Sequence, residues 1–152
     1  MDILIRWLAD GSLILVVLIG IAAVLIANRP SRWLARLPFG IMAGLTALLV
    51  GKLMSLLYQP AVARPFIELG VTPGAAYIDN PGFPSDHALL AGVVVLAVAF
   101  LTPYKKLAFV IALLTILMGA ARVLALVHTP LDVIGGFAAA CVGALWYLSA
   151  RR

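Results

Sequence analysis

The chain has 152 residues, of which 64% are hydrophobic and only 11% are charged, and its formal net charge is +5. Its mean hydropathy of +1.15 lies far above that of soluble domains, so the composition excludes an ordinary soluble protein. In a membrane protein, a basic excess reports first on topology and on anionic lipid headgroups. The sequence has no stripe of basic residues interleaved with aromatic ones, so it does not predict a nucleic-acid groove. Cys141 is the only cysteine, which excludes an internal disulfide and a cysteine metal cluster.

Five apolar stretches are each near the roughly 20 residues needed to cross a bilayer. They are expected at about residues 11–28, 38–58, 86–102, 107–127 and 131–149. No alternating pattern of a membrane-spanning strand occurs, so the predicted fold class is an all-α membrane protein, a bundle of about five transmembrane helices in one domain over residues 1–152. Residues 1–10 are expected to form a short interfacial helix.

Small residues recur at four-residue spacing in the second apolar stretch, where Gly40 precedes Gly44 and Ala47 precedes Gly51. This spacing places each pair on one helix face, and small side chains let helix backbones approach closely in a membrane. We expect all four positions to pack against neighbouring helices.

The charges divide between the two ends of the predicted helices. Five crossings place seven cations and no acid on the face that holds the C-terminus: Arg29, Arg32, Arg36, Lys105, Lys106, Arg151 and Arg152. The opposite face receives all six acids: Asp2, Asp10, Glu68, Asp79, Asp86 and Asp132. Since cytoplasmic loops carry an excess of Lys and Arg, this division predicts a cytoplasmic C-terminus and an extracytoplasmic loop at about residues 59–85.

Three fragments on the acid-bearing face carry most of the reactive side chains. They are Lys52…Arg64-Pro65, Pro84-Ser85-Asp86-His87, and Arg122, His128 and Asp132 with five and three residues between them. Ionisable groups at a membrane edge are costly, so they indicate a functional site. Three cations that meet at one point repel each other unless an anion lies between them, and Arg binds phosphate oxygens in bidentate fashion. The fragments therefore predict hydrolysis of a phosphate ester or pyrophosphate at a membrane surface.

The spacing of His128 and Asp132 places both side chains on one helical face. Asp132 can then hold one imidazole nitrogen and leave the other free for nucleophilic attack. The alternative is that both residues only cap the start of the last helix.

Pro84-Ser85-Asp86-His87 precedes an apolar run and has the pattern of a helix start. Helix N-termini bind phosphate through free N–H groups, the Ser85 hydroxyl adds a donor, and His87 can protonate a leaving oxygen. The alternative for Ser85 and Asp86 is simple capping. For Lys52 and Arg122 the alternative is that the side chain extends toward lipid headgroups. For Arg64 the alternative is an ordinary solvated side chain.

The order Lys…Arg-Pro, Pro-Ser-x-His and Arg-x5-His-x3-Asp resembles the type 2 phosphatidic acid phosphatase family over about residues 40–145. The resemblance implies a metal-independent phosphohydrolase without a cofactor on a helical bundle. It implies His128 as a nucleophile that forms a phosphohistidine, Asp132 as its orienting partner, and His87 as general acid and then base. Lys52, Arg64, Ser85 and Arg122 are implied as phosphate ligands, helped by the backbone N–H near Asp86.

The chain departs from the family pattern at three positions. Lys52 and Arg64 are twelve positions apart rather than about seven, and a straight helix would separate them by roughly 18 Å. Pro60 is therefore expected to break the helix if Lys52 is a ligand. Ala121 replaces a usual serine, and Asp86 replaces the commoner glycine. Members typically have six spanning helices, so residues 1–10 or a second protomer is expected to close the core.

Residues 79–87 are similar to those of small bacterial polyprenyl diphosphate phosphatases. The resemblance implies hydrolysis of undecaprenyl diphosphate at the extracytoplasmic face of the bacterial cytoplasmic membrane, in recycling of the cell-wall lipid carrier. The expected partners are the lipid phosphate substrate and the bilayer, with a homo-oligomer possible and no nucleic acid. The alternatives are a phosphatidylglycerophosphate or phosphatidate phosphatase, a non-catalytic phospholipid-binding or transport protein, and a metal-dependent hydrolase, against which the wide separation of the two histidines argues.

Overall fold

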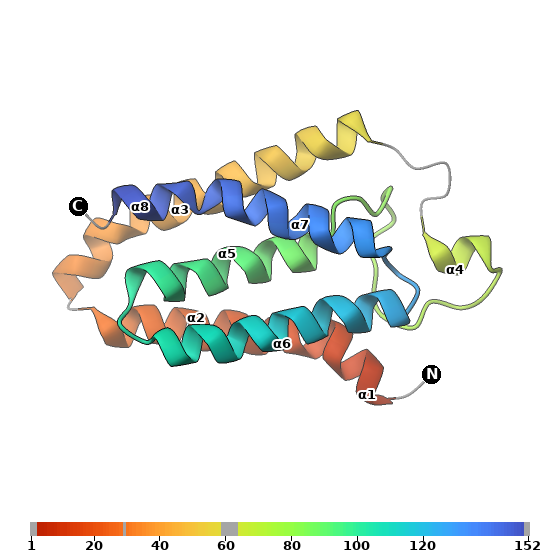
Figure 1. The fold of residues 1–152 in the computed structure, drawn as a ribbon, viewed down its shortest axis with the longest axis horizontal. Helices are drawn as coiled ribbons and strands as arrows, with labels where there is room; N and C mark the ends of the chain where they lie inside the picture. The colour runs from red at the N-terminus through yellow and green to blue at the C-terminus, as the bar shows by residue number, and fades with distance from the viewer. Residues whose placement is uncertain (1–2, 29, 59–63, 151–152) are drawn as a thin grey trace.

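The computed structural model describes residues 3–28, 30–58 and 64–150, and the secondary structure of these residues is entirely helical. The N-terminal segment joins α1 (Ile3–Arg6), a π-helical turn (Trp7–Gly11) and α2 (Ser12–Ala27). The later helices are α3 (Pro30–Leu57), α4 (Pro65–Glu68), α5 (Asp86–Leu101), α6 (Lys105–Leu124), α7 (Pro130–Gly143) and α8 (Leu145–Ser149). The long helices α2, α3, α6 and α7 run along a common axis with α5 in the middle (Figure 1), so the predicted all-α bundle is confirmed.

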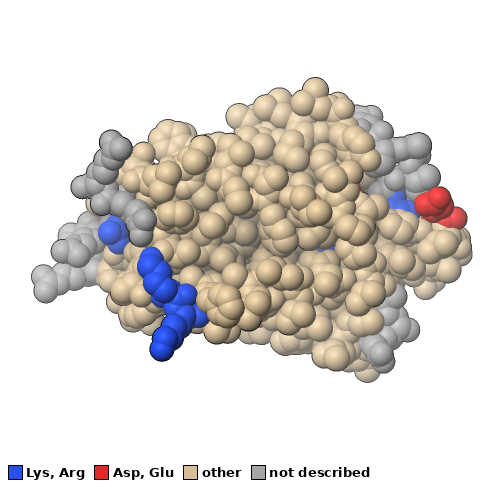
Figure 2. Space-filling model, in the orientation of Figure 1, with Lys and Arg blue, Asp and Glu red and all other residues tan. Residues whose placement is uncertain are grey.

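Among the described residues, four helical segments are long and apolar enough to cross a membrane: Ile3–Ala27, Leu34–Leu57, Lys105–Leu124 and Pro130–Ser149. The fifth predicted crossing, α5, has only 16 residues and is about 24 Å long, against roughly 30 Å of hydrocarbon. It packs against α2, α3, α6 and α7, so protein surrounds it more than lipid does. Figure 2 shows a broad uncharged band between the two ends of the molecule, as a membrane-spanning bundle requires.

The N-terminal residues do not form the separate interfacial helix expected over residues 1–10. From residue 3 onward they continue into α2 as one helical segment. Ala9 is fully buried in a cluster with Phe66 and Val127, and Leu8 packs against that cluster. These two side chains pack against protein beside α6, whereas Ile3, Leu4 and Trp7 of the same segment remain exposed.

Close helix packing uses only some of the predicted small residues. A Cβ added at Gly143 of α7 would lie 2.3 Å from a backbone oxygen of α3, beside the fully buried Ala47. A Cβ at Gly51 would lie 2.9 Å from a leucine of α5. Gly40 and Gly44 have nothing within 4 Å of an added Cβ, so the prediction of close packing is wrong there. The four-residue spacing predicted a helix face lined by small residues, but it did not indicate which neighbouring helix packs against that face.

The two ends of the bundle differ in their loops. α8 and the α5–α6 connection lie at one end, whereas α1, α4 and the α6–α7 turn lie at the other end (Figure 1). At the first end, Arg36 donates to the carbonyl oxygen of Leu101 at 2.8 Å. The histidines and the other fragments predicted as a site gather at the second end.

Candidate active site

The turn between α6 and α7 is hydrogen-bonded to the segment that follows Arg64. The carbonyl oxygens of Ala125 and Leu126 accept the backbone N–H groups of Gly74 at 3.0 Å and Phe66 at 3.1 Å. Leu126 has a φ of 59°, a left-handed conformation that is uncommon outside glycine. This conformation belongs to the turn that brings the start of the loop against the residues just before His128.

Two glycines of α7 lack the side chains that would otherwise clash with the segment at the start of α5. A Cβ at Gly136 would lie 2.4 Å from the backbone oxygen of Ser85, and one at Gly135 would lie 2.7 Å from the ring of Phe83. The Ser85 N–H donates to the backbone oxygen of Asp132 at 2.9 Å. The N-terminus of α5 therefore lies against the first turn of α7, which brings the two histidine-bearing fragments together.

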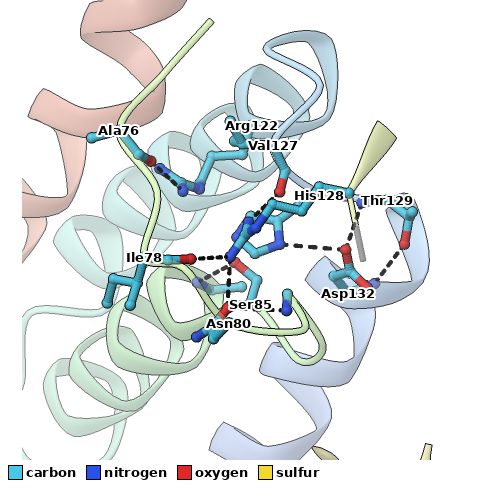
Figure 3. A network of polar contacts seen from close by, with 12 residues as sticks. Ala76, Ile78, Asn80, Ser85, Arg122, Val127, His128, Thr129 and Asp132 are labelled. Atoms are coloured by element: carbon cyan, nitrogen blue, oxygen red, sulfur yellow. Dashed lines mark hydrogen bonds and ion pairs between the residues drawn. The ribbon is translucent and has the colours of Figure 1, made fainter. Parts of the chain in front are cut away.

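His128 and Asp132 form a buried pair. Nδ1 of His128 lies 3.3 Å from Oδ2 of Asp132, and Figure 3 shows the carboxylate to one side of the imidazole ring. The same oxygen accepts the Thr129 N–H at 2.7 Å, and Thr129 Oγ1 accepts the Asp132 N–H at 3.2 Å. Asp132 thus completes a capping box for α7 and also holds the imidazole, so the capping and orienting roles coexist.

Burial favours the neutral form of His128. Desolvation lowers the pKa of His128 below its usual value and outweighs the hydrogen bond that His128 donates to Asp132, which raises it. A contact of Nδ1 with the carboxylate assigns the ring proton to Nδ1, and Nε2 is then unprotonated. A neutral imidazole of this tautomer is the form that can attack phosphorus.

Arg64 is buried and held by its terminal nitrogens. Nη1 donates to the carbonyl oxygen of Val127 at 2.5 Å, and Nη2 donates to Ile78 O at 2.8 Å and to Asn80 Oδ1 at 2.6 Å. The guanidinium also lies 5.2 Å from the centre of the Tyr77 ring. Burial lowers the pKa of Arg64, yet a guanidinium remains protonated in proteins. Its Nε is buried and has no acceptor among the described residues.

Arg122 is held in the same way from a different side. Nη1 donates to Asp10 Oδ1 at 2.9 Å and to Ala9 O at 3.3 Å. Nη2 donates to Ala76 O at 2.9 Å, the contact drawn in Figure 3. Its Nε is also buried without an acceptor in the described part of the chain. Each guanidinium thus uses three of its five N–H donors, and its Nε–H has no acceptor among the described residues. A phosphate oxygen is a suitable acceptor for that Nε–H.

One cavity of about 240 Å³ joins these groups, because its lining includes Arg64, Asp86, His87, Arg122 and His128. Asp132 contacts the far side of the His128 ring. Ser85 is fully buried as the N-cap of α5, where Oγ accepts the Ala88 N–H at 3.5 Å, and it does not line the cavity. No three His, Cys, Asp or Glu side chains of the described residues are grouped to hold a metal ion.

Lys52 lies apart from the two arginines. It is exposed on α3 and lines a second cavity of about 250 Å³, which shares Asn80 and Asp86 with the first. α3 continues to Leu57, and Pro60, the expected helix breaker, falls outside the described residues. The role of Lys52 as a phosphate ligand stays a prediction.

Two polar side chains that hold the arginines were not among the residues predicted for the site. Asn80 accepts from Arg64 and also from the Gly82 N–H at 3.0 Å, while Asp10 pairs with Arg122. An acid directly before an apolar run was a usable signal for Asp10, because such acids are costly in or near a membrane. An asparagine in a loop rich in proline and glycine offered no comparable signal.

Comparison with known proteins adds one result to this geometry. The model of the PAP2 superfamily matches residues 11–152, beginning one residue after Asp10. No curated protein and no solved structure matches the chain. The matched region contains all three fragments and every residue predicted as part of the site. The chain belongs to the PAP2 superfamily, whose members are phosphatases.

Proposed function

We propose that this protein is a membrane lipid phosphatase that removes the terminal phosphate of a lipid diphosphate, and that undecaprenyl diphosphate is its substrate. The observation that carries the proposal is the shared cavity at one end of the bundle. There two histidines meet two buried arginines, each with an unused Nε–H donor. A phosphate group carries the negative charge and the acceptor oxygens that suit these two arginines.

The first step transfers the phosphoryl group to His128. Nε2 bonds to the terminal phosphorus while the bond from phosphorus to the leaving oxygen breaks. His87 gives a proton to that oxygen, which leaves as part of the lipid monophosphate. Arg64 and Arg122 neutralise charge on the equatorial oxygens of the transition state.

The second step releases inorganic phosphate. His87, now neutral, takes a proton from water, and the water oxygen bonds to phosphorus as the phosphorus–nitrogen bond of phosphohistidine breaks. His128 returns to its neutral form. Asp132 stabilises the positive charge that the ring carries while it is phosphorylated. Neither of these two reaction steps requires a metal ion.

The cavity beside Lys52 supports a diphosphate rather than a monoester. It adjoins the cavity of the histidines through Asn80 and Asp86 and has an exposed ammonium group in its lining. A diphosphate that places its terminal phosphate next to His128 must place its second phosphate nearby. Lys52 is suited to that second phosphate, since a lysine acts as a mobile point charge.

The distribution of charge supports an extracytoplasmic site in the bacterial cytoplasmic membrane. Lys105 and Lys106 at the start of α6, and Arg36, which donates to the carbonyl oxygen of Leu101, lie at the end opposite the histidines (Figure 1). Cytoplasmic ends are the cation-rich ones. Lipid carrier released outside the cell by polymer export carries a diphosphate at that face. The protein would return it to the monophosphate form.

Phosphate release by the purified full chain in detergent tests the proposal. The panel contains undecaprenyl diphosphate, phosphatidylglycerophosphate and phosphatidate, each with and without EDTA. We expect preference for the diphosphate, no effect of EDTA, and loss of activity by about 10³-fold or more in His128→Ala. Retained activity in that variant rejects the nucleophile, and an EDTA effect reversed by a divalent ion rejects the metal-free mechanism. Preference for a phospholipid assigns a different substrate, and no release from any lipid favours a binding or transport protein.

A further inference from the structure

Asp10 is an acid from the N-terminal helical segment that reaches the predicted active site. Its Oδ1 lies 2.9 Å from Nη1 of Arg122, and its Oδ2 accepts the backbone N–H of Ala76 at 3.0 Å. One carboxylate therefore joins three parts of the chain: the turn Trp7–Gly11, the loop before α5, and the end of α6. It is not one of the residues proposed to bind or transfer phosphate.

The two partners of the ion pair between Asp10 and Arg122 are buried to different extents. The side chain of Arg122 is 2% exposed, whereas that of Asp10 is 28% exposed. A buried guanidinium that loses its counter-charge is strongly destabilised, because its charge is left without a partner away from water. The remaining acceptors of Arg122 are backbone oxygens of Ala9 and Ala76, which carry no full charge. Asp10 supplies the only carboxylate that is hydrogen-bonded to Arg122 among the described residues.

Asp10 lies behind the arginine rather than in the cavity. Arg122 lines the cavity of the histidines and so does Leu13, one turn further along the same helix, but Asp10 does not. Its contacts take up the Nη1 end of the guanidinium and leave Nε without an acceptor. Asp10 is thus placed to hold the guanidinium in one orientation without meeting the phosphate.

We propose that Asp10 is a positioning residue for phosphate binding, which acts through Arg122 and makes the N-terminal helical segment part of the active site. The proposal rests on the proposed phosphatase function, since it concerns the same phosphate site. It makes a prediction opposite to simple electrostatics. Removal of a negative charge near an anion site should tighten phosphate binding, whereas loss of the orientation of Arg122 should weaken it.

The test compares Asp10→Asn with the wild-type chain in detergent. We measure kcat and KM for the lipid phosphate that the wild type hydrolyses, and the inhibition constant of inorganic phosphate. We expect Asp10→Asn to raise KM and the phosphate inhibition constant about tenfold, the order of effect that outer partners have on the ligands they orient. Glu68→Gln is the matched control, because Glu68 is an exposed acid at the same end of the molecule. It should change both constants by less than about twofold.

Equal or tighter phosphate inhibition in Asp10→Asn overturns the proposal. If that variant does not fold, Asp10→Glu keeps the charge but moves the carboxylate by one methylene group. It should raise the phosphate inhibition constant by a smaller factor, and an unchanged constant again overturns the proposal. A wild type that hydrolyses no lipid phosphate refutes the proposed function instead. Phosphate binding to the wild type and to Asp10→Asn, followed by the thermal shift it produces, then tests the positioning role separately.

Discussion

His128 and Asp132 are joined by a 3.3 Å contact whose carboxylate oxygen also accepts the backbone N–H of Thr129. The start of α7 and the orientation of the imidazole therefore depend on one atom. An asparagine can still accept both hydrogen bonds, but it carries no charge to stabilise a phosphorylated imidazole. An alanine loses both functions. The two substitutions separate the structural contribution from the chemical one.

We expect Asp132→Asn to lower kcat about 10²-fold or more while it changes the unfolding temperature little. Asp132→Ala should lower kcat at least as much and also destabilise the fold by about 1 kcal/mol, the usual cost of a lost helix cap. Phosphate release and thermal unfolding in detergent measure the two effects. Near-normal kcat in Asp132→Asn would show that the carboxylate serves only the helix.

The pH dependence of kcat/KM should follow the neutral form of His128. Activity then falls as the pH decreases through the pKa of His128, and burial moves that pKa below about 6.5. Asp132 raises this pKa, so Asp132→Asn should move the acidic limb to lower pH. Ionisation of the substrate is the same for both proteins and does not affect the comparison. A shift of the limb to higher pH in the variant would contradict the assignment.

Lys52→Ala should reduce the preference for a diphosphate over a monoester. We expect the ratio of kcat/KM values for undecaprenyl diphosphate and phosphatidate to fall about fivefold, because an exposed ion pair contributes up to about 1 kcal/mol. Lys106→Ala, an exposed lysine at the opposite end of the bundle, is the control. An equal loss with both lipids would place Lys52 on the transferred phosphate, and no loss would remove it from the site.

Gly136→Ala should disrupt the contact between α5 and α7. The added Cβ would lie 2.4 Å from a backbone oxygen that cannot rotate away, so we expect destabilisation by about 1–3 kcal/mol and reduced phosphate release. Gly44→Ala is the control, since an added Cβ there has no neighbour within 4 Å. It should be neutral or stabilising by up to about 1 kcal/mol. Equal unfolding temperatures for the two variants would mean that the helices tolerate a wider spacing.

Local patterns were sufficient for the predicted pair on α7 and for the start of α5. The spacing of His128 and Asp132 implied a contact because residues four apart share a helix face, and the structure has that contact. Pro84 and Ser85 implied a helix start, and α5 begins at Asp86 with Ser85 as its cap. These features depend only on residues close in the chain.

Contacts between distant segments were less predictable. Asp10 and Arg122 are 112 positions apart, and nothing local to either residue indicates the other. For residues 1–10 the sequence left two positions open, the membrane surface and the closure of the core, and their described part packs against protein beside the site. Gly40 and Gly44 were expected in a helix contact and face open space.

The sequence by itself determined the helical membrane class and the three chemical fragments, and its four-residue spacing predicted that His128 and Asp132 share one helix face. Hydropathy and helical periodicity are properties of single segments, so they can be evaluated without knowing the neighbours. Only the tertiary structure decided that both arginines are held by their Nη atoms, that Asp10 reaches Arg122, and that Lys52 lies in an adjoining cavity. These features depend on which helix faces meet, and that choice follows from the packing of the whole bundle.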